Sequence, residues 1–217
     1  MSTGRWIGIV YLLYFATSGL GAWLGGRVLV AGDPGAWAGN MLAHEATYRA
    51  GYAFGLIGNA TYVALTILFY GLFRPVHRTL ALLMASFSLI GCTTQIVAGI
   101  LQLAPLVILH ESRLAGLFTI DQLRAAATVS LKIWSHTYDI SFVLFGLFDF
   151  VLGLLIVRST LLPRSLGVAM MIAGVVATTF LYPPLALALK WFVLPVAGAA
   201  EGVLMLWLLI RGVKVRA

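Results

Sequence analysis

The stretch of sequence that decides the fold is IWSHTYDISFVLFGLFDFVLGLLIVR, which runs from Ile133 to Arg158. It is long and apolar enough to cross a bilayer, yet Asp139 lies near its start and Asp149 in its middle. An ionised carboxylate at the centre of a membrane helix costs about 2.5 to 3.5 kcal/mol on the insertion scale. Asp149 therefore needs a compensating interaction inside the folded protein.

The composition of the whole chain is that of an integral membrane protein. Hydrophobic residues make up 61% of its 217 residues and charged residues only 10%, and the mean hydropathy is +1.01. A membrane-crossing helix needs about 20 apolar residues, and several stretches reach that length. We expect one all-α domain over residues 1–217, a bundle of six transmembrane helices with two long helical extensions on the outer face. The expected spans are residues 6–29, 51–73, 80–103, 137–157, 165–187 and 191–210.

Two outer connections are expected to continue the spans as helices. Asp33-Pro34-Gly35 predicts a turn, and Asn40 then predicts the N-cap of a helix that runs on into the second span. Further along, Thr119 and Gln122 have the spacing of a capping box. Because no Pro follows for many residues, one helix of 39 residues is expected from Ile120 to Arg158. Its length would be about 58 Å, more than the bilayer requires.

Basic residues set the expected orientation in the membrane. With six spans, both termini share one side, and that side holds the tight basic turns RPVHR (74–78) and RSTLLPR (158–164). By the positive-inside rule we expect a multi-pass protein of the cell membrane with both termini in the cytoplasm. The formal charge of +7 has no soluble basic domain to carry it, so no nucleic-acid partner is expected. Cys92 is the only cysteine, which excludes a disulfide framework.

Polar side chains recur at helical spacing on the second and fourth spans, and each series descends from the outer surface towards the centre of the membrane. We expect these two faces to line a cavity that is open to the outer side and narrows towards two acidic residues, Asp149 and Glu201. The candidate ligand-binding residues are His44, Glu45, Tyr48, Arg49, Tyr52, Asn59, Tyr62, His136, Asp139, Asp149 and Glu201.

A polar layer is expected at the middle of the bundle, because every span brings a polar group there. Asp149 and Glu201 are its carboxyls, and all Lys and Arg lie near span ends or in connections. Two neighbouring carboxyls cannot both ionise cheaply in a low dielectric, so protonation, a shared proton or hydrogen bonds are expected to compensate them. The neutral members of the layer also have a plainer interpretation as hydrogen bonds that join helices. They are Thr17, Ser18, Asn59, Tyr62, Thr93, Thr94, Gln95, Thr178 and Thr179.

Two further patterns each have a packing interpretation. His44, Glu45, His136 and Asp139 would supply the three or four ligands that a divalent metal such as zinc takes, if their spans adjoin. The alternative is a polar cap at the membrane interface, in which Glu45 and Arg49 pair at i, i+4. Small-xxx-small pairs, for their part, favour close approach of two helices. They are Gly21 with Gly25 and Gly51 with Gly55.

Two segments resemble a known family. They are NMLAHEATYRAGYAFGLIG (Asn40 to Gly58) and SHTYDISFVLFGLFDFVLGLLIVRSTLLPRSLGV (Ser135 to Val168), with RPVHRTLALL between them. With them the chain resembles, over nearly its whole length, the prokaryotic membrane family catalogued as domain of unknown function 4386. The resemblance implies a multi-span membrane protein and names neither substrate nor catalytic residue.

The leading functional hypothesis is binding or passage of a small molecule, lipid-like or cationic, with the midplane carboxyls as the protonatable step. The sequence does not decide whether the protein is an enzyme. One alternative is a metal-dependent intramembrane hydrolase, in which Glu45 or Asp139 acts as the general base. Another is haem binding, with His44 and His136 as axial ligands. A third is a structural or accessory subunit without a ligand, whose polar layers serve packing alone.

Overall fold

The regular structure is helical throughout the described part of the chain. The computed structural model describes residues 3–29, 34–110 and 116–213. Among these residues, six helical segments are long and apolar enough to cross a membrane, which confirms the predicted fold class. In chain order the elements are α1 (Thr3–Val28), α2 (Pro34–Ala43), α3 (Glu45–Phe73), α4 (Arg78–His110), α6 (Ile120–Arg158), α7 (Arg164–Ala177), the 3-10 turn η1 (Thr178–Leu181) and α8 (Pro183–Ile210).

The longest helix, α6, has the bounds that the sequence predicts. It contains 39 residues without an internal Pro. Its start is the expected capping box, since the Thr119 N–H donates to Gln122 Oε1 at 2.8 Å and the Gln122 N–H donates to Thr119 Oγ1 at 3.3 Å. Two otherwise unpaired backbone donors are thereby satisfied where the chain turns into the helix.

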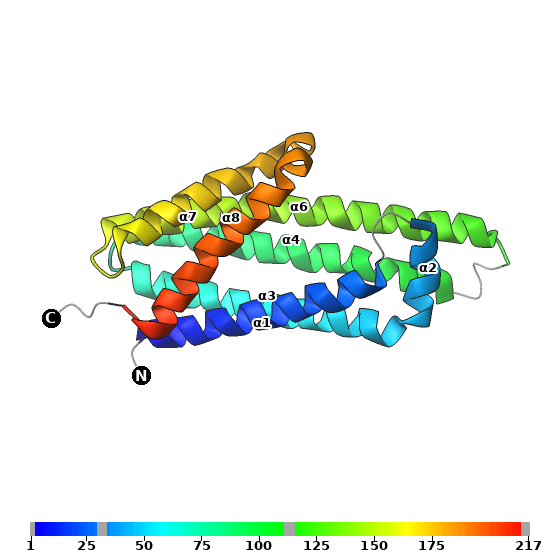
Figure 1. Ribbon diagram of the computed structural model, residues 1–217, viewed down its shortest axis with the longest axis horizontal. Coiled ribbons are helices and arrows are strands. Elements are labelled where there is room, and N and C mark those ends of the chain that lie inside the picture. The colour runs from blue at the N-terminus through cyan, green and yellow to red at the C-terminus, as the bar shows by residue number, and fades with distance from the viewer. Residues whose placement is uncertain (1–2, 30–33, 111–115, 214–217) are drawn as a thin grey trace. The chain divides into compact units, whose positions relative to one another are not determined.

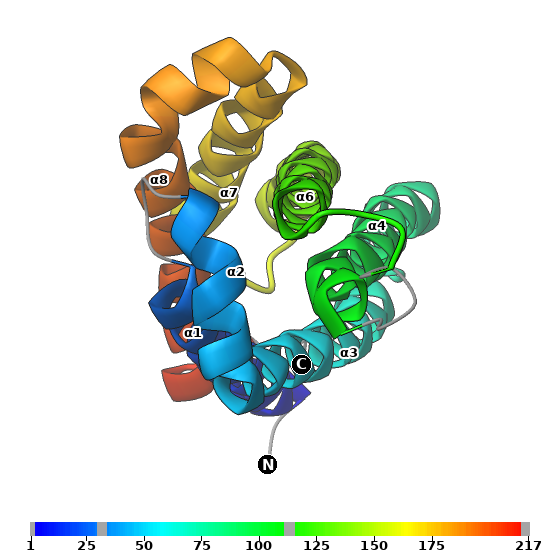
Figure 2. The same cartoon turned by 90° about the vertical axis from the view of Figure 1, so that its right-hand side faces the viewer.

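The prediction for Asn40 was wrong. Asn40 lies inside α2, a separate helix of 10 residues that begins at Pro34, and α3 begins only at Glu45. Pro suits the first position of a helix because its ring fixes φ and it has no N–H to leave unpaired. The sequence reasoning took Pro34-Gly35 for part of a turn and so placed the helix start too late; Asp33 lies outside the described residues. Figure 2 shows α2 as a short element distinct from α3.

The fifth and sixth spans meet earlier in the chain than the sequence suggests. The fifth candidate span covers Arg164–Leu181, whereas the expectation was residues 165–187. The 3-10 turn η1 ends at Leu181, and α8 starts with Pro at its first positions. Prolines end a preceding helix and begin the next one, because they cannot donate the backbone hydrogen bond of a helix interior. Helices α7 and α8 thus form a hairpin with its bend at Tyr182 (Figure 1).

The chain divides into two compact units, and the long helices contribute to both. The first unit comprises residues 1–14, 60–93 and 139–217. The second comprises residues 15–59 and 94–138.

Glycines set the closest helix contacts of the second unit. A Cβ built on Gly21 of α1 would lie 2.9 Å from the Gly51 carbonyl oxygen of α3, and one built on Gly51 would lie 2.9 Å from the Gly25 nitrogen. The predicted close approach of these two helices is therefore confirmed. The four glycines are not equivalent, however, since a Cβ on Gly25 or Gly55 would meet nothing within 4 Å.

Glycines also lie at close contacts between helices of the first unit. A Cβ on Gly146 of α6 would lie 2.8 Å from the Gly174 carbonyl oxygen of α7. A Cβ on Gly8 of α1 would lie 2.5 Å from the Leu209 nitrogen of α8. These contacts bring α6 close to α7 and α1 close to α8. The acidic residues Asp149 of α6 and Glu201 of α8 both belong to this unit.

Candidate functional site

The two midplane carboxyls belong to one buried cluster in the first unit. Asp149 of α6 is only 2% exposed. Glu201 of α8 is partly buried, and its Oε2 accepts a hydrogen bond of 2.8 Å from the hydroxyl of Tyr11 on α1. Asp149 and Glu201 are close enough to interact electrostatically, and Tyr11 interacts with both. The two carboxyls therefore lie near each other in one unit, while the cavity expected to join them stays a prediction.

Aromatic rings pack around Tyr62 of α3, which interacts electrostatically with both carboxyls. Its ring centroid lies 4.6 Å from that of Tyr14, 5.7 Å from that of Phe148 and 5.1 Å from that of Phe145, in edge-to-face geometry. The Tyr11 ring lies 6.5 Å away at 79°. Such pairs each contribute about 0.5 to 1.5 kcal/mol beyond their burial. The ring cluster thus holds the side chains of the site in a fixed arrangement.

Two buried polar atoms of this cluster have no hydrogen-bond partner in the described part of the chain. They are Asp149 Oδ1 and the Tyr62 hydroxyl oxygen. Tyr62 also interacts electrostatically with both carboxyls. An unsatisfied buried polar group costs about 1 to 3 kcal/mol, so two of them in one cluster call for a missing partner. A proton, a small cation or an ordered water would supply it.

Several neutral polar side chains of the spans make hydrogen bonds that join helices or stay within one helix, although the Tyr62 hydroxyl makes none in the described part of the chain. In the second unit the Asn59 amide donates to Gln95 Oε1 at 3.0 Å. In the first unit Thr66 and Ser88 share a hydrogen bond of 2.5 Å between α3 and α4. The Thr93, Thr178 and Thr179 hydroxyls donate to backbone carbonyls of the preceding turn. These bonds match the packing interpretation of the layer.

The predicted outer cluster is organised around an ion pair. Arg49 Nε lies 2.6 Å from Glu45 Oε1, as the i, i+4 spacing predicts, and His110 Nε2 lies 3.2 Å from Glu45 Oε2. His44 is exposed at the junction between α2 and α3. Within residues 3–29, 34–110 and 116–213, no three His, Cys, Asp or Glu side chains come together as a metal site requires. The structure thus brings Glu45 to Arg49 and His110 rather than into a ligand set.

Tyr48 and Tyr52 of the predicted stripe pack against α4. Tyr48 is fully buried, and its hydroxyl donates to the Gln102 carbonyl oxygen at 2.7 Å. The Tyr52 ring lies against Gly99, where a Cβ would come within 3.0 Å of the ring. Both tyrosines therefore fix α3 to α4 within the second unit. Asp139 is partly buried in the first unit.

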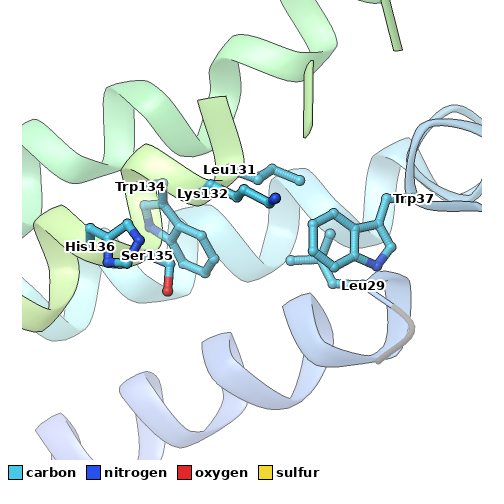
Figure 3. Close-up of a pocket in the computed structure, with 7 residues that line it drawn as sticks. All are labelled: Leu29, Trp37, Leu131, Lys132, Trp134, Ser135 and His136. Carbon is cyan, nitrogen blue, oxygen red and sulfur yellow. The ribbon is translucent and has the colours of Figure 1, made fainter. Parts of the chain in front are cut away.

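His136 lines a pocket of the second unit, which we call the indole pocket. Its volume is about 470 Å³. Leu29, Trp37, Leu131 and Trp134 form its apolar walls, and Lys132, Ser135 and His136 supply its polar groups (Figure 3). The pocket thus lies between the residue that follows α1, helix α2 and the N-terminal part of α6. The sequence reasoning expected the second and fourth spans to line the cavity.

Comparison with known proteins supports the resemblance noted in the sequence. The family model described as "Domain of unknown function (DUF4386)" matches residues 6–212. The chain belongs to the DUF4386 family. Comparison with curated proteins and comparison with solved structures each gave no match. The family assignment of this DUF4386 protein therefore identifies a membrane family and leaves its activity to be argued from the site.

Sequence reasoning missed the residues of the first span that complete the acidic cluster of this DUF4386 protein. Tyr11 donates to Glu201, and Tyr14 packs on Tyr62. A signal was present, because Tyr11, Tyr14 and Ser18 follow each other at intervals of three and four in an otherwise apolar helix. His110 was likewise given no role, since its partner Glu45 is 65 residues away in the sequence and only the fold brings the two together.

Proposed function

We propose that this DUF4386 protein binds or passes a small molecule, cationic or lipid-like and cationic, and that Asp149 and Glu201 form its protonatable binding step. The observation that carries the proposal is the Asp149 carboxyl. It is 2% exposed, interacts with a second carboxyl and leaves Oδ1 without a hydrogen-bond partner among the described residues. A cation or a proton at this position would reduce the repulsion between the two carboxyls and would also give Asp149 Oδ1 a partner.

The charge balance of the cluster favours a cationic ligand. Within the described part of the chain, no Lys, Arg or His forms an ion pair with Asp149 or Glu201; the ion pairs there involve Glu45 and Asp121. The tyrosines that interact with the pair are Tyr11 and Tyr62. Leaving two carboxylates uncompensated in a low dielectric costs several kcal/mol. In the free protein a proton would reduce this cost, and a bound cation would replace that proton.

The ring cluster adds a second reason for a cation. The faces of Tyr and Phe rings attract cations, by about 0.5 to 2 kcal/mol depending on desolvation. Tyr62 interacts electrostatically with Asp149, and its ring packs on that of Phe148 in the same unit. An organic ammonium or phosphonium ion would contact both kinds of group. A neutral or anionic ligand would gain from neither.

The test uses a lipophilic cation as a probe. Tetraphenylphosphonium binding to the purified full chain in lipid nanodiscs is measured by equilibrium dialysis at several pH values, and protons released on binding are followed in a weakly buffered solution. Wild type is expected to bind more weakly as the pH falls and to release protons on binding. Asp149→Asn and Glu201→Gln are expected to lose both properties.

The matched control is Asp121→Asn, which removes a carboxylate whose side chain is 86% exposed at the start of α6. It is expected to behave as wild type does. Binding that is independent of pH in wild type, or proton release that persists in Asp149→Asn, would contradict the proposal. A variant Asp149→Leu that is more stable than wild type and binds equally well would favour a packing role for the carboxyl.

We further propose that both termini face the cytoplasm. The basic turns at residues 74–78 and 158–164 support this orientation through the positive-inside rule. Cys92 is buried, so single cysteines introduced at exposed positions can be labelled selectively in intact cells. A membrane-impermeant maleimide is expected to label Leu117→Cys and to leave Thr160→Cys unlabelled. The reverse pattern would invert the orientation.

A further inference from the structure

The indole pocket carries a positive charge, opposite in sign to the carboxyls of the acidic cluster. Its charged group is the ammonium of Lys132, an exposed side chain that extends from α6 towards Trp37 (Figure 3). In the described part of the chain, no carboxylate lies within ion-pair distance of Lys132. Among the described residues, the positive charge of the pocket is therefore not neutralised by a carboxylate.

Lys132 and His136 can serve the same ligand. They are four residues apart on one helix, and such residues lie on the same face with Cβ atoms about 5 to 6 Å apart. Both line the pocket, together with the Ser135 hydroxyl. An ammonium, an imidazole and a hydroxyl in this arrangement offer hydrogen-bond donors to the several oxygens of a phosphate group.

The remaining walls of the pocket are apolar and firmly held. Leu131 is buried in a hydrophobic cluster with Val28 and Met41, and Trp37 and Trp134 pack against that cluster. Trp side chains favour the interface between hydrocarbon and headgroups, because an indole combines an apolar body with one N–H donor. A pocket of about 470 Å³ falls within the usual range for small-molecule sites. It is large enough for a headgroup together with the first part of an attached chain.

We propose that the indole pocket binds an anionic phospholipid. Its phosphate would be held by Lys132, His136 and Ser135, and its glycerol and upper acyl carbons would pack against Trp37, Trp134 and Leu131. A basic side chain near anionic headgroups contributes about 1 kcal/mol, and the apolar walls would contact the carbons next to the headgroup. A free phosphate ion would make no use of the apolar walls of the pocket. The site lies in the second unit and does not depend on the cation site at Asp149.

The test uses bromine, which quenches the fluorescence of a Trp that it contacts. The full chain is placed in nanodiscs of phosphatidylcholine that contain a small fraction of brominated phosphatidylglycerol, and quenching is compared with that by brominated phosphatidylcholine at the same fraction. Wild type is expected to show stronger quenching with the anionic lipid. Trp134→Phe is expected to remove most of the difference, which assigns the signal to the pocket.

Charge variants separate the pocket from general attraction to an anionic membrane. Lys132→Gln is expected to weaken the preference for the anionic lipid roughly fivefold, as loss of one basic residue near a membrane does. Lys132→Arg is expected to retain it, and Lys132→Gln with His136→Gln to abolish it. The matched control is Arg124→Gln, which removes a cation two turns earlier on the same helix, where Arg124 is paired with Asp121 at 3.6 Å. It is expected to leave the preference unchanged.

Three results would overturn the proposal. The first is equal quenching by the two brominated lipids in wild type. The second is an effect of Arg124→Gln as large as that of Lys132→Gln. The third is displacement of the anionic lipid by millimolar inorganic phosphate, which would assign the pocket to a free anion. None of these results bears on tetraphenylphosphonium binding at Asp149, so the two proposals fail independently.

Discussion

Replacing Gly51 with Ala should loosen the contact between α1 and α3, whereas the same change at Gly55 should not. A Cβ on Gly51 would lie 2.9 Å from the Gly25 nitrogen and 3.1 Å from the Gly21 carbonyl oxygen, both of which are backbone atoms that cannot turn away. Overpacking of this kind costs about 1 to 3 kcal/mol. A Cβ on Gly55 would meet nothing within 4 Å.

The comparison of the two variants isolates the effect of the contact. Both gain the helix preference of Ala over Gly, about 1 kcal/mol, so the difference between them is the overpacking alone. For a chain of this size, 1 kcal/mol shifts the melting temperature by roughly 2 to 4 °C. Gly51→Ala should therefore melt about 2 to 12 °C below Gly55→Ala.

The single cysteine provides the assay. Cys92 is 1% exposed in the folded protein, so a thiol-reactive dye labels it only as the protein unfolds on heating. Melting curves of wild type, Gly51→Ala and Gly55→Ala are recorded in the same detergent, with size-exclusion profiles before heating to confirm that each variant is folded. A Gly51→Ala protein that melts at or above the temperature of Gly55→Ala would refute the reasoning.

Three further changes test individual contacts. Tyr11→Phe removes the hydrogen bond to Glu201 and leaves a partly buried carboxyl without its donor, so the melting temperature should fall by an amount equivalent to about 1 to 3 kcal/mol. Gln122→Ala removes the hydrogen bond from the Thr119 N–H and should cost about 0.5 to 1.5 kcal/mol, visible as faster amide hydrogen exchange in the first turn of α6. Glu45→Gln breaks exposed ion pairs only and should leave the melting temperature unchanged at physiological salt.

Local signals in the sequence predicted the parts of the fold that local chemistry determines. The bounds of α6 follow from a capping box at one end and the absence of Pro along its length. The glycine contacts of α1 and α3 follow from small residues at intervals of four. Asn40 shows the limit of this reasoning, because either a turn or a helix start is compatible with Pro34-Gly35 and only the fold selects the helix.

A site residue could be predicted from the sequence only where its burial in the membrane has a high free-energy cost. Asp149 stands out in any reading of the sequence, because a carboxyl in a membrane span is expensive. Tyr11 does not, since a tyrosine in an apolar helix has many roles, and its partner Glu201 is 190 residues away. Trp37 and Trp134 are of a residue type that is typical of membrane interfaces. Their position on opposite sides of a basic pocket depends on how α2 and α6 pack, which the sequence does not state.

The most direct test of the central claim is infrared spectroscopy of the carboxyl groups in nanodiscs at neutral pH. Asp149 and Glu201 are proposed to act as one acidic site that retains a proton until a cation binds. Wild type should then show the C=O stretching band of a protonated carboxyl that is lost in Asp149→Asn, is shifted in Glu201→Gln, and disappears when tetraphenylphosphonium binds. Identical spectra for wild type and Asp149→Asn, or a band at Asp149 that Glu201→Gln does not alter, would contradict it.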